Sequence, residues 1–156
     1  PWEGEKKLKD TIGPNFPAIN MDYEQIRTFL DELNKRATKP IGTKYVLPTA
    51  RQWREFAEKI QGELFRRRLV IANYDSKKLE VVGSRQDTLG FFDLFGNAWE
   101  WTSSTNKEGK RIYVGGSCYS TLDVLKNSIK QTDRDSYGDN IANIDLGFRV
   151  GIIKEN

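Results

Sequence analysis

Residues 90–102 read Gly90-Phe91-Phe92-Asp93-Leu94-Phe95-Gly96-Asn97-Ala98-Trp99-Glu100-Trp101-Thr102 and say more about the structure than any other part of the chain. Two tryptophans flank one carboxylate, and a Gly-Asn pair precedes them. Glycines and aromatic residues are denser here than an amphipathic helix or strand requires. Glycine occurs where the backbone turns a corner that other residues disfavour. The pattern predicts strand residues around a tight corner, with Glu100 partly buried between the two indole rings.

Five other fragments of the chain belong to the same family pattern as residues 90–102. Two later ones are Val114-Gly115-Gly116-Ser117 and Leu146-Gly147-Phe148-Arg149-Val150, and three earlier ones are residues 16–24 (FPAINMDYE), 45–54 (YVLPTARQWR) and 81–84 (VVGS). Together with residues 88–102 they follow, in order from about Phe16 to Ile152, the pattern of a known family. The chain resembles the formylglycine-generating-enzyme family, a large branch of the C-type lectin fold.

The resemblance implies an α+β fold, in which two helices pack on short twisted antiparallel sheets with much irregular loop. The chain of 156 residues is expected to be a single domain, 1–156, which is long enough to bury a core. Residues 1–15 are expected to form an N-terminal loop or arm. Because one fold hosts many activities, the function has to be argued from the residues of the site.

Local patterns predict the main elements. Asp22 with Gln25 predicts a capping box and a helix that runs to about residue 37, and Thr49 with Gln52 predicts the cap of a second helix. The apolar stripe expected to be core is Trp53, Phe56, Ala57 and Ile60, and the helical period fades after Gly62. Short strands are predicted at 69–72, 79–82, 98–102, 112–114 and 147–153.

Composition excludes several classes of function. The chain has no histidine, which excludes histidine-dependent triads and zinc sites of the Cys/His type. It has one cysteine, so no disulfide can form within it. The formal net charge is only +3 and Arg66–Arg68 is the one basic cluster, so no nucleic-acid partner is expected. No apolar run approaches the length that spans a bilayer, so no membrane insertion is expected.

The family's enzymes oxidise a substrate cysteine to formylglycine, and the resemblance locates their machinery. Those enzymes hold copper between two cysteines that follow the Gly-Gly-Ser fragment, since a cuprous ion prefers soft thiolates. Aligned on Gly115-Gly116-Ser117, the two cysteine positions fall on Ser120 and Leu125, whereas Cys118 lies two residues early. The sequence therefore predicts no copper, no catalytic residue and no enzyme. We expect Cys118 to be a partly buried structural residue.

The resemblance also implies a structural calcium ion around residues 93–100. Side-chain oxygens would come from Asp93 and Glu100, and backbone carbonyls from the region of Gly96 and Ala98. Two carboxylates suit a hard cation that takes oxygen ligands. A buried unpaired carboxylate is costly, so either a cation or a hydrogen-bond cluster is needed. The alternative is that Glu100 accepts backbone N–H groups and that no metal binds.

Residues 118–124 suggest a function in recognition. Each of them can be encoded by a codon that differs from the asparagine codon AAC only at its adenines, which is typical of diversity-generating retroelements. The known variable proteins of these systems are similar to this chain, and their diversified segment corresponds here to residues 115–148. The predicted ligand-binding residues form two clusters, Cys118, Tyr119, Ser120, Thr121, Leu122, Asp123 and Val124, and then Thr132, Asp133, Arg134, Asp135 and Tyr137.

We therefore predict a non-catalytic ligand-binding protein, with a protein or a glycan on a cell surface as its partner. A variable protein of this kind would itself lie on a cell surface or a virus particle. Two alternatives stay open. The chain could be a family member without diversification that serves as a scaffold domain, or it could be an enzyme of the formylglycine-generating type.

Overall fold

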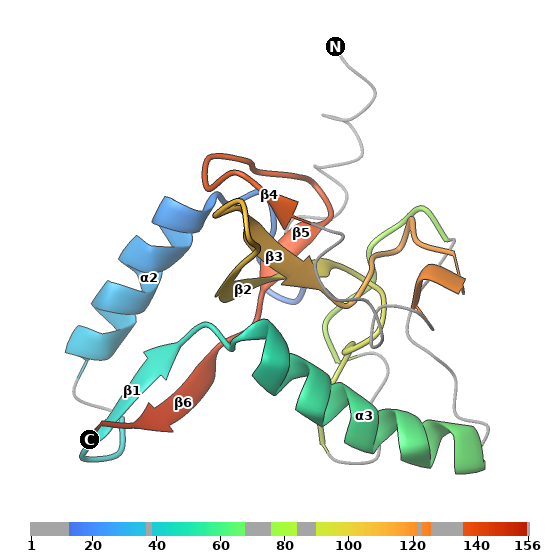
Figure 1. Cartoon of the computed structure of the whole chain (residues 1–156), viewed down its shortest axis with the longest axis horizontal. Coiled ribbons are helices and arrows are strands. Elements are labelled where there is room, and N and C mark those ends of the chain that lie inside the picture. The colour runs from blue at the N-terminus through green and yellow to red at the C-terminus, as the bar shows by residue number, and fades with distance from the viewer. Residues whose placement is uncertain are drawn as a thin grey trace.

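The computed structural model describes residues 13–36, 39–67, 76–83, 90–121, 123–125 and 136–155, with the backbone alone at 60–67 and 136–137. The named elements in these ranges are shown in Figure 1. They are the helices α2 (Tyr23–Lys35) and α3 (Ala50–Arg67) and the strands β1 (Thr43–Val46), β2 (Trp99–Thr105), β3 (Arg111–Val114), β4 (Ser136–Tyr137), β5 (Leu146–Phe148) and β6 (Gly151–Lys154). None of the described helices is long and apolar enough to cross a bilayer.

The strands form two small sheets. The larger has the order β4-β3-β2-β5, and the smaller pairs β1 with β6 in antiparallel register. Helix α2 contacts β1, and α3 contacts β2 and β3, so both helices pack on short strands as expected. One pairing departs from the predicted antiparallel pattern: β5 runs parallel to β2 and places Gly147 opposite Glu100. The architecture is α+β, with long irregular connections (Figure 1).

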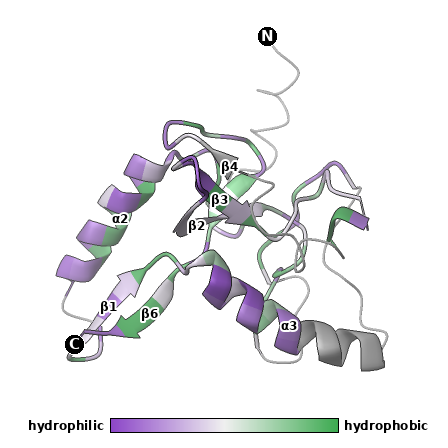
Figure 2. Cartoon of the chain, viewed as in Figure 1, coloured by the Kyte–Doolittle hydropathy of each residue, from purple (hydrophilic) through white to green (hydrophobic). Residues whose placement is uncertain are grey.

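Both predicted helix caps are present. The Gln25 backbone N–H donates to Asp22 Oδ1 at 2.8 Å, and the Asp22 N–H donates to Gln25 Oε1 at 3.0 Å, which completes the capping box. The same exchange joins Thr49 and Gln52 at 3.1 and 2.9 Å. Hydrophilic residues dominate the visible sides of α2 and of the described part of α3 (Figure 2). These local hydrogen bonds set where each helix begins.

Several element boundaries differ from the prediction. Helix α2 ends at Lys35 and α3 continues past Gly62 to Arg67. Residues 79–82 form no strand, β1 was not predicted, and 147–153 divides between β5 and β6 in different sheets. Phe56 was expected in the core but is 43% exposed, with its ring 5.3 Å from that of Phe91. The strand predicted at 69–72 lies outside the described residues.

Two apolar clusters form the core, and the 90–102 stretch joins them. One cluster packs α3 against β3 and includes Trp53, Leu94 and Phe95. The other packs α2 against β1, β2 and β5 and includes Ile26 and Trp101. Within the 90–102 stretch, Leu94 and Phe95 belong to the first cluster, whereas Trp101 belongs to the second and Trp99 packs against it. Glu100 lies at the junction of the two clusters.

Candidate functional site

The Gly-Gly-Ser corner after β3 orients the predicted ligand-binding loop. Gly116 has a φ of +79°, and a Cβ atom added to it would collide with the side chain of Leu125. Only glycine meets both demands without strain, because it adopts positive φ freely and carries no side chain. The corner thereby turns the chain out of β3 and toward residues 117–125.

A buried hydrogen-bond network fixes the inner side of this loop to the rest of the molecule. Ser117 Oγ donates to Asp145 Oδ2 at 2.6 Å, and the Ser117 backbone N–H donates to Ser120 Oγ at 2.9 Å. The Cys118 N–H donates to the Asn97 carbonyl, and the Cys118 carbonyl accepts from the Lys77 N–H at 3.0 Å. Buried polar groups with satisfied partners make a segment rigid. The loop is therefore fixed to the residue before β5, to the corner before β2 and to Lys77.

The structure separates the first predicted cluster of ligand-binding residues into two groups. Tyr119 (42% exposed), Thr121, Asp123 and Val124 lie on the surface. Cys118 and Ser120 are 0% and 8% exposed and point into the molecule. We call the four exposed residues the 119–124 surface. Cys118 and Ser120 support this surface from inside and are not available for contact with a ligand.

The second predicted cluster is mostly beyond the described part of the chain. Leu122 and Thr132 to Asp135 lie outside the described residues. The backbone of Tyr137 belongs to β4, where it pairs with Arg111 of β3. The described residues thus bring the four members of the 119–124 surface together, whereas their position relative to the second cluster stays a prediction.

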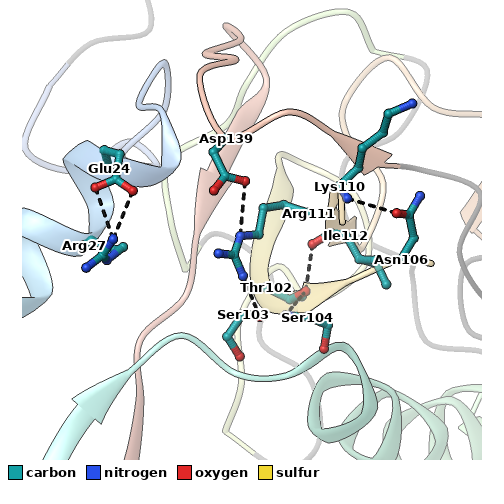
Figure 3. Close-up of polar contacts among 10 residues, drawn as sticks. All are labelled: Glu24, Arg27, Thr102, Ser103, Ser104, Asn106, Lys110, Arg111, Ile112 and Asp139. Atoms are coloured by element: carbon teal, nitrogen blue, oxygen red, sulfur yellow. Dashed lines mark hydrogen bonds and ion pairs between the residues drawn. The ribbon is translucent and has the colours of Figure 1, made fainter. Parts of the chain in front are cut away.

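Arg111 connects the larger sheet to the segment just after β4, which we call the returning segment. The sequence pattern did not predict this role. The Arg111 guanidinium stacks over the Tyr23 ring at 3.9 Å, its Nε lies 3.2 Å from Asp139 Oδ1, and its Nη1 donates to the Ser103 carbonyl at 3.0 Å. Figure 3 shows Asp139 reaching down to Arg111 from the returning segment. These contacts fix the segment just after β4 against β2, β3 and the start of α2. An arginine between a polar turn and the predicted strand 112–114 was the available signal.

Cys118 has the properties of a structural thiol. Burial, and to a lesser degree the nearby Asp145 carboxylate, raise the pKa of Cys118 to about 12. The reactive form of cysteine is the thiolate, which this environment disfavours. Cys118 is thus more deeply buried than the partial burial that was expected, and its structural role stays a prediction.

Glu100 has partners that neither predicted alternative included. Its Oε2 accepts from Trp53 Nε1 at 2.9 Å, and its two oxygens accept from Arg149 Nε and Nη2, the shortest contact being 2.6 Å. Glu100 is 8% exposed, so the pair lies in a region of low dielectric. The sequence carried no local signal for Arg149, because the parallel register that places Gly147 opposite Glu100 exists only in the folded chain.

Asp93 lies beside this pair in a left-handed backbone conformation, with φ +53°. Its Oδ2 accepts from the Gly83 N–H at 3.0 Å. Burial raises the pKa of Asp93, and the hydrogen bond from Gly83 and the charge of Arg149 partly oppose that rise. Gly96, also predicted in the calcium set, donates its N–H to the Gly115 carbonyl and thereby joins the corner to β3.

The predicted calcium set consists of two carboxylates, from Asp93 and Glu100, and two backbone carbonyls, near Gly96 and Ala98. Calcium takes six to eight oxygen ligands. Two carboxylates and two carbonyls that each give one oxygen would supply about half of that number. Glu100 already faces the cation Arg149, and the described residues contain no group of three or more acidic or sulfur ligands that could hold a metal. Calcium at Asp93, Gly96, Ala98 and Glu100 stays a prediction, and the ion pair supplies the charge balance for Glu100.

Comparison with known proteins finds a matching family model and solved structures of similar fold. The model of the family described as "Sulfatase-modifying factor enzyme 1-like domain" matches residues 2–153. Among solved structures, CarF has a TM-score of 0.67 at 19% identity, covering 95% of this chain and 71% of CarF. Variable protein 1 of Treponema denticola has a TM-score of 0.63 at 17% identity, covering 87% of this chain and 70% of that protein. No curated protein matches the sequence. At these identities the two structures show a shared fold.

Proposed function

The chain belongs to the family of the sulfatase-modifying factor enzyme 1-like domain, and on that premise we propose that it is a non-catalytic ligand-binding member. The proposed contact region is the 119–124 surface, continued by the part of residues 115–148 that follows it. The expected partner is a protein or a glycan on a cell surface. The proposal includes diversification of this region by a retroelement, as the codon pattern suggests.

The observation that carries the proposal is the contrast between buried and exposed residues in one short loop. Ser117, Cys118 and Ser120 are buried and hydrogen-bonded, whereas Tyr119 and Val124 are 42% and 41% exposed. Recognition sites are commonly loops whose position a rigid scaffold sets. A tyrosine offers a large amphipathic contact at low entropic cost, and Thr121 and Asp123 add polar contacts. This arrangement presents variable side chains without disturbing the core.

The same loop argues against formylglycine chemistry. The family enzymes need two soft thiolates for copper, and this chain has a single cysteine that is fully buried. Its pKa of about 12 keeps the thiol protonated at neutral pH. Ser120, which aligns with the first copper cysteine, uses its hydroxyl to accept the Ser117 N–H. The family nevertheless contains enzymes by its description, so activity has to be tested directly.

Sequencing of the gene and its surroundings in several isolates tests the binding proposal. We expect a nearby reverse transcriptase gene and a repeat that differs from the codons for 115–148 only at adenines. Among the described positions, variation should include 119, 121, 123 and 124 and spare Ser117 and Asp145. Variation spread evenly over buried and exposed positions, or the absence of such a repeat, would leave a non-diversified scaffold domain as the better account.

An activity assay tests the enzyme alternative. The purified chain is loaded with cuprous ion and incubated with a cysteine-containing sulfatase peptide, and the peptide is analysed by mass spectrometry. We expect no formylglycine. Product that disappears in a Cys118→Ala variant would show that the lone thiol is catalytic and would overturn the proposal.

A further inference from the structure

A pocket of about 310 Å³ opens beside the Glu100–Arg149 pair, and it contains none of the residues of the 119–124 surface. Its volume is within the range of small-molecule sites. Its charged residues are Asp93, Glu100 and Arg149. Its aromatic residues come from four separate segments of the chain: Phe16, Phe91, Phe92, Trp99 and Phe148. A concave, mostly aromatic site with a few convergent polar groups is the usual form of a binding pocket.

The charges of this pocket do not cancel. Arg149 pairs with Glu100 through its Nε and Nη2 atoms and also donates to the Phe92 carbonyl at 2.9 Å. Asp93 forms no ion pair with any cation in the described part of the chain, although it interacts with the charge of Arg149. Its carboxylate accepts the Gly83 backbone N–H and a hydrogen bond from the Asn97 side chain. A carboxylate has about four lone-pair sites, so Asp93 retains capacity to accept further hydrogen bonds. The pocket therefore carries an excess negative charge.

We propose that this pocket binds a small organic ammonium ion, with Asp93 as its counter-ion and the aromatic residues as its walls. A primary ammonium group donates N–H bonds to a carboxylate, and its charge is attracted to aromatic faces within about 6 Å. An anion would meet Asp93 unfavourably, and a neutral ligand would leave its charge unpaired. A bare metal ion such as calcium, which takes six to eight oxygen ligands, would find fewer than that number among these mostly aromatic walls.

The backbone conformation of Asp93 determines which substitution can test its role as counter-ion. At φ +53° the residue occupies the left-handed region, in which Asp and Asn are the side chains best tolerated after glycine. Asp93→Asn therefore removes the charge while keeping the shape and the backbone. Phe92, which is 37% exposed and lines the pocket, offers a second independent substitution: Phe92→Leu removes the aromatic face and keeps an apolar side chain.

The test measures binding of n-butylammonium chloride to the full chain by calorimetry and ligand-observed NMR at constant ionic strength. The probes for comparison are 1-butanol, a neutral analogue of similar shape, and butyrate, an anion. We expect butylammonium to bind about tenfold or more tightly than butanol, the scale of one charge-assisted contact in a partly desolvated site. Asp93→Asn should remove this preference, and Phe92→Leu should weaken ammonium binding by about threefold to tenfold.

The matched control is Glu108→Gln, which removes an exposed carboxylate in the turn between β2 and β3 and should leave binding unchanged. Circular dichroism melts verify that each variant is folded, and Phe92→Leu tests the proposal if Asp93→Asn does not fold. Equal binding of butanol and butylammonium, undiminished binding in Asp93→Asn, or no saturable binding would each overturn the proposal. Stoichiometric displacement of butylammonium by calcium chloride would also overturn it, in favour of a metal site.

Discussion

Arg149 Nη2 lies 2.6 Å from Glu100 Oε1, so the carboxylate between the two tryptophans is paired with a guanidinium 49 positions later in the chain. The pair connects β2 to the segment that leaves β5, and Trp53 of α3 donates to the same carboxylate. Three separate elements therefore meet at one charge. Since the side chains of Glu100 and Arg149 are 10% and 25% exposed, solvent screens this pair only weakly.

Loss of the guanidinium should be strongly destabilising. Arg149→Met leaves the Glu100 carboxylate buried without its cation while Trp53 still donates to it, and a broken buried pair typically costs about 3–5 kcal/mol of unfolding free energy. Urea unfolding measures this loss. The control is Arg51→Met, which breaks an exposed pair with Glu55 and should change stability little. The double variant Glu100→Gln with Arg149→Met should recover part of the loss; equal losses in Arg51→Met and Arg149→Met would contradict the argument.

Stability should fall at alkaline pH because of Cys118. Its folded pKa of about 12 lies above its ordinary value of 9.0, so the unfolded chain loses the thiol proton first. This contribution is fully present below about pH 9 and is lost as pH rises toward 12, at up to about 1.4 kcal/mol per pH unit. Urea unfolding at several pH values measures it against Cys118→Ala, which lacks the thiol. Parallel pH curves for the two proteins would show that the thiol is not responsible.

Two glycines allow backbone strain to be separated from steric conflict. Gly116 and Gly109 have nearly equal φ values, +79° and +77°, but a Cβ at Gly116 would collide with Leu125, whereas nothing lies within 4 Å of one at Gly109. Gly109→Ala should cost about 1 kcal/mol, the strain of a left-handed residue. Gly116→Ala should cost about 2–4 kcal/mol, since overpacking adds to that strain. Thermal unfolding of both variants measures these losses of stability. Similar losses in the two variants would indicate that Leu125 moves aside readily.

Calcium should have little effect on stability if Arg149 balances Glu100. A ligand that binds only the folded state raises its melting temperature by mass action, and removal of that ligand lowers it. We expect the melting temperature to stay within about 1 °C on addition of EDTA or of millimolar calcium chloride, since a shift of several degrees corresponds to about 1 kcal/mol in a domain of this size. Magnesium chloride serves as the control for ionic strength. A clear rise with calcium alone would restore the predicted ion at Asp93 and Glu100.

Features that depend on neighbouring residues were predictable. Asp22 with Gln25 and Thr49 with Gln52 exchange hydrogen bonds across three positions, a geometry that depends on no distant part of the chain. The boundaries of α3 and of the strands were less predictable, because packing extends or divides elements whose own periodicity is weak. Residues 147–153 show this: Leu146 to Phe148 pairs with β2, whereas the next four-residue strand pairs with β1.

The candidate site also has features that the sequence predicted and features that only the folded chain revealed. The single cysteine and the lack of histidine limit the chemistry through composition alone, because a residue that is absent cannot act. The burial of Cys118 and Ser120 beneath Tyr119 could not be read from the sequence. All three lie within one irregular loop without periodicity, and its path is set by hydrogen bonds to Asn97 and Asp145.

The caps of both helices, the glycine corners and the family follow from the order of the amino acids, since each depends on residues close together in the chain. The meeting of Glu100 with Arg149, and the place of Asp93 beside them in an aromatic pocket, instead required the folded chain. Those contacts follow from the parallel register of β2 and β5, and the strength of a charge pair depends on the burial that this register creates.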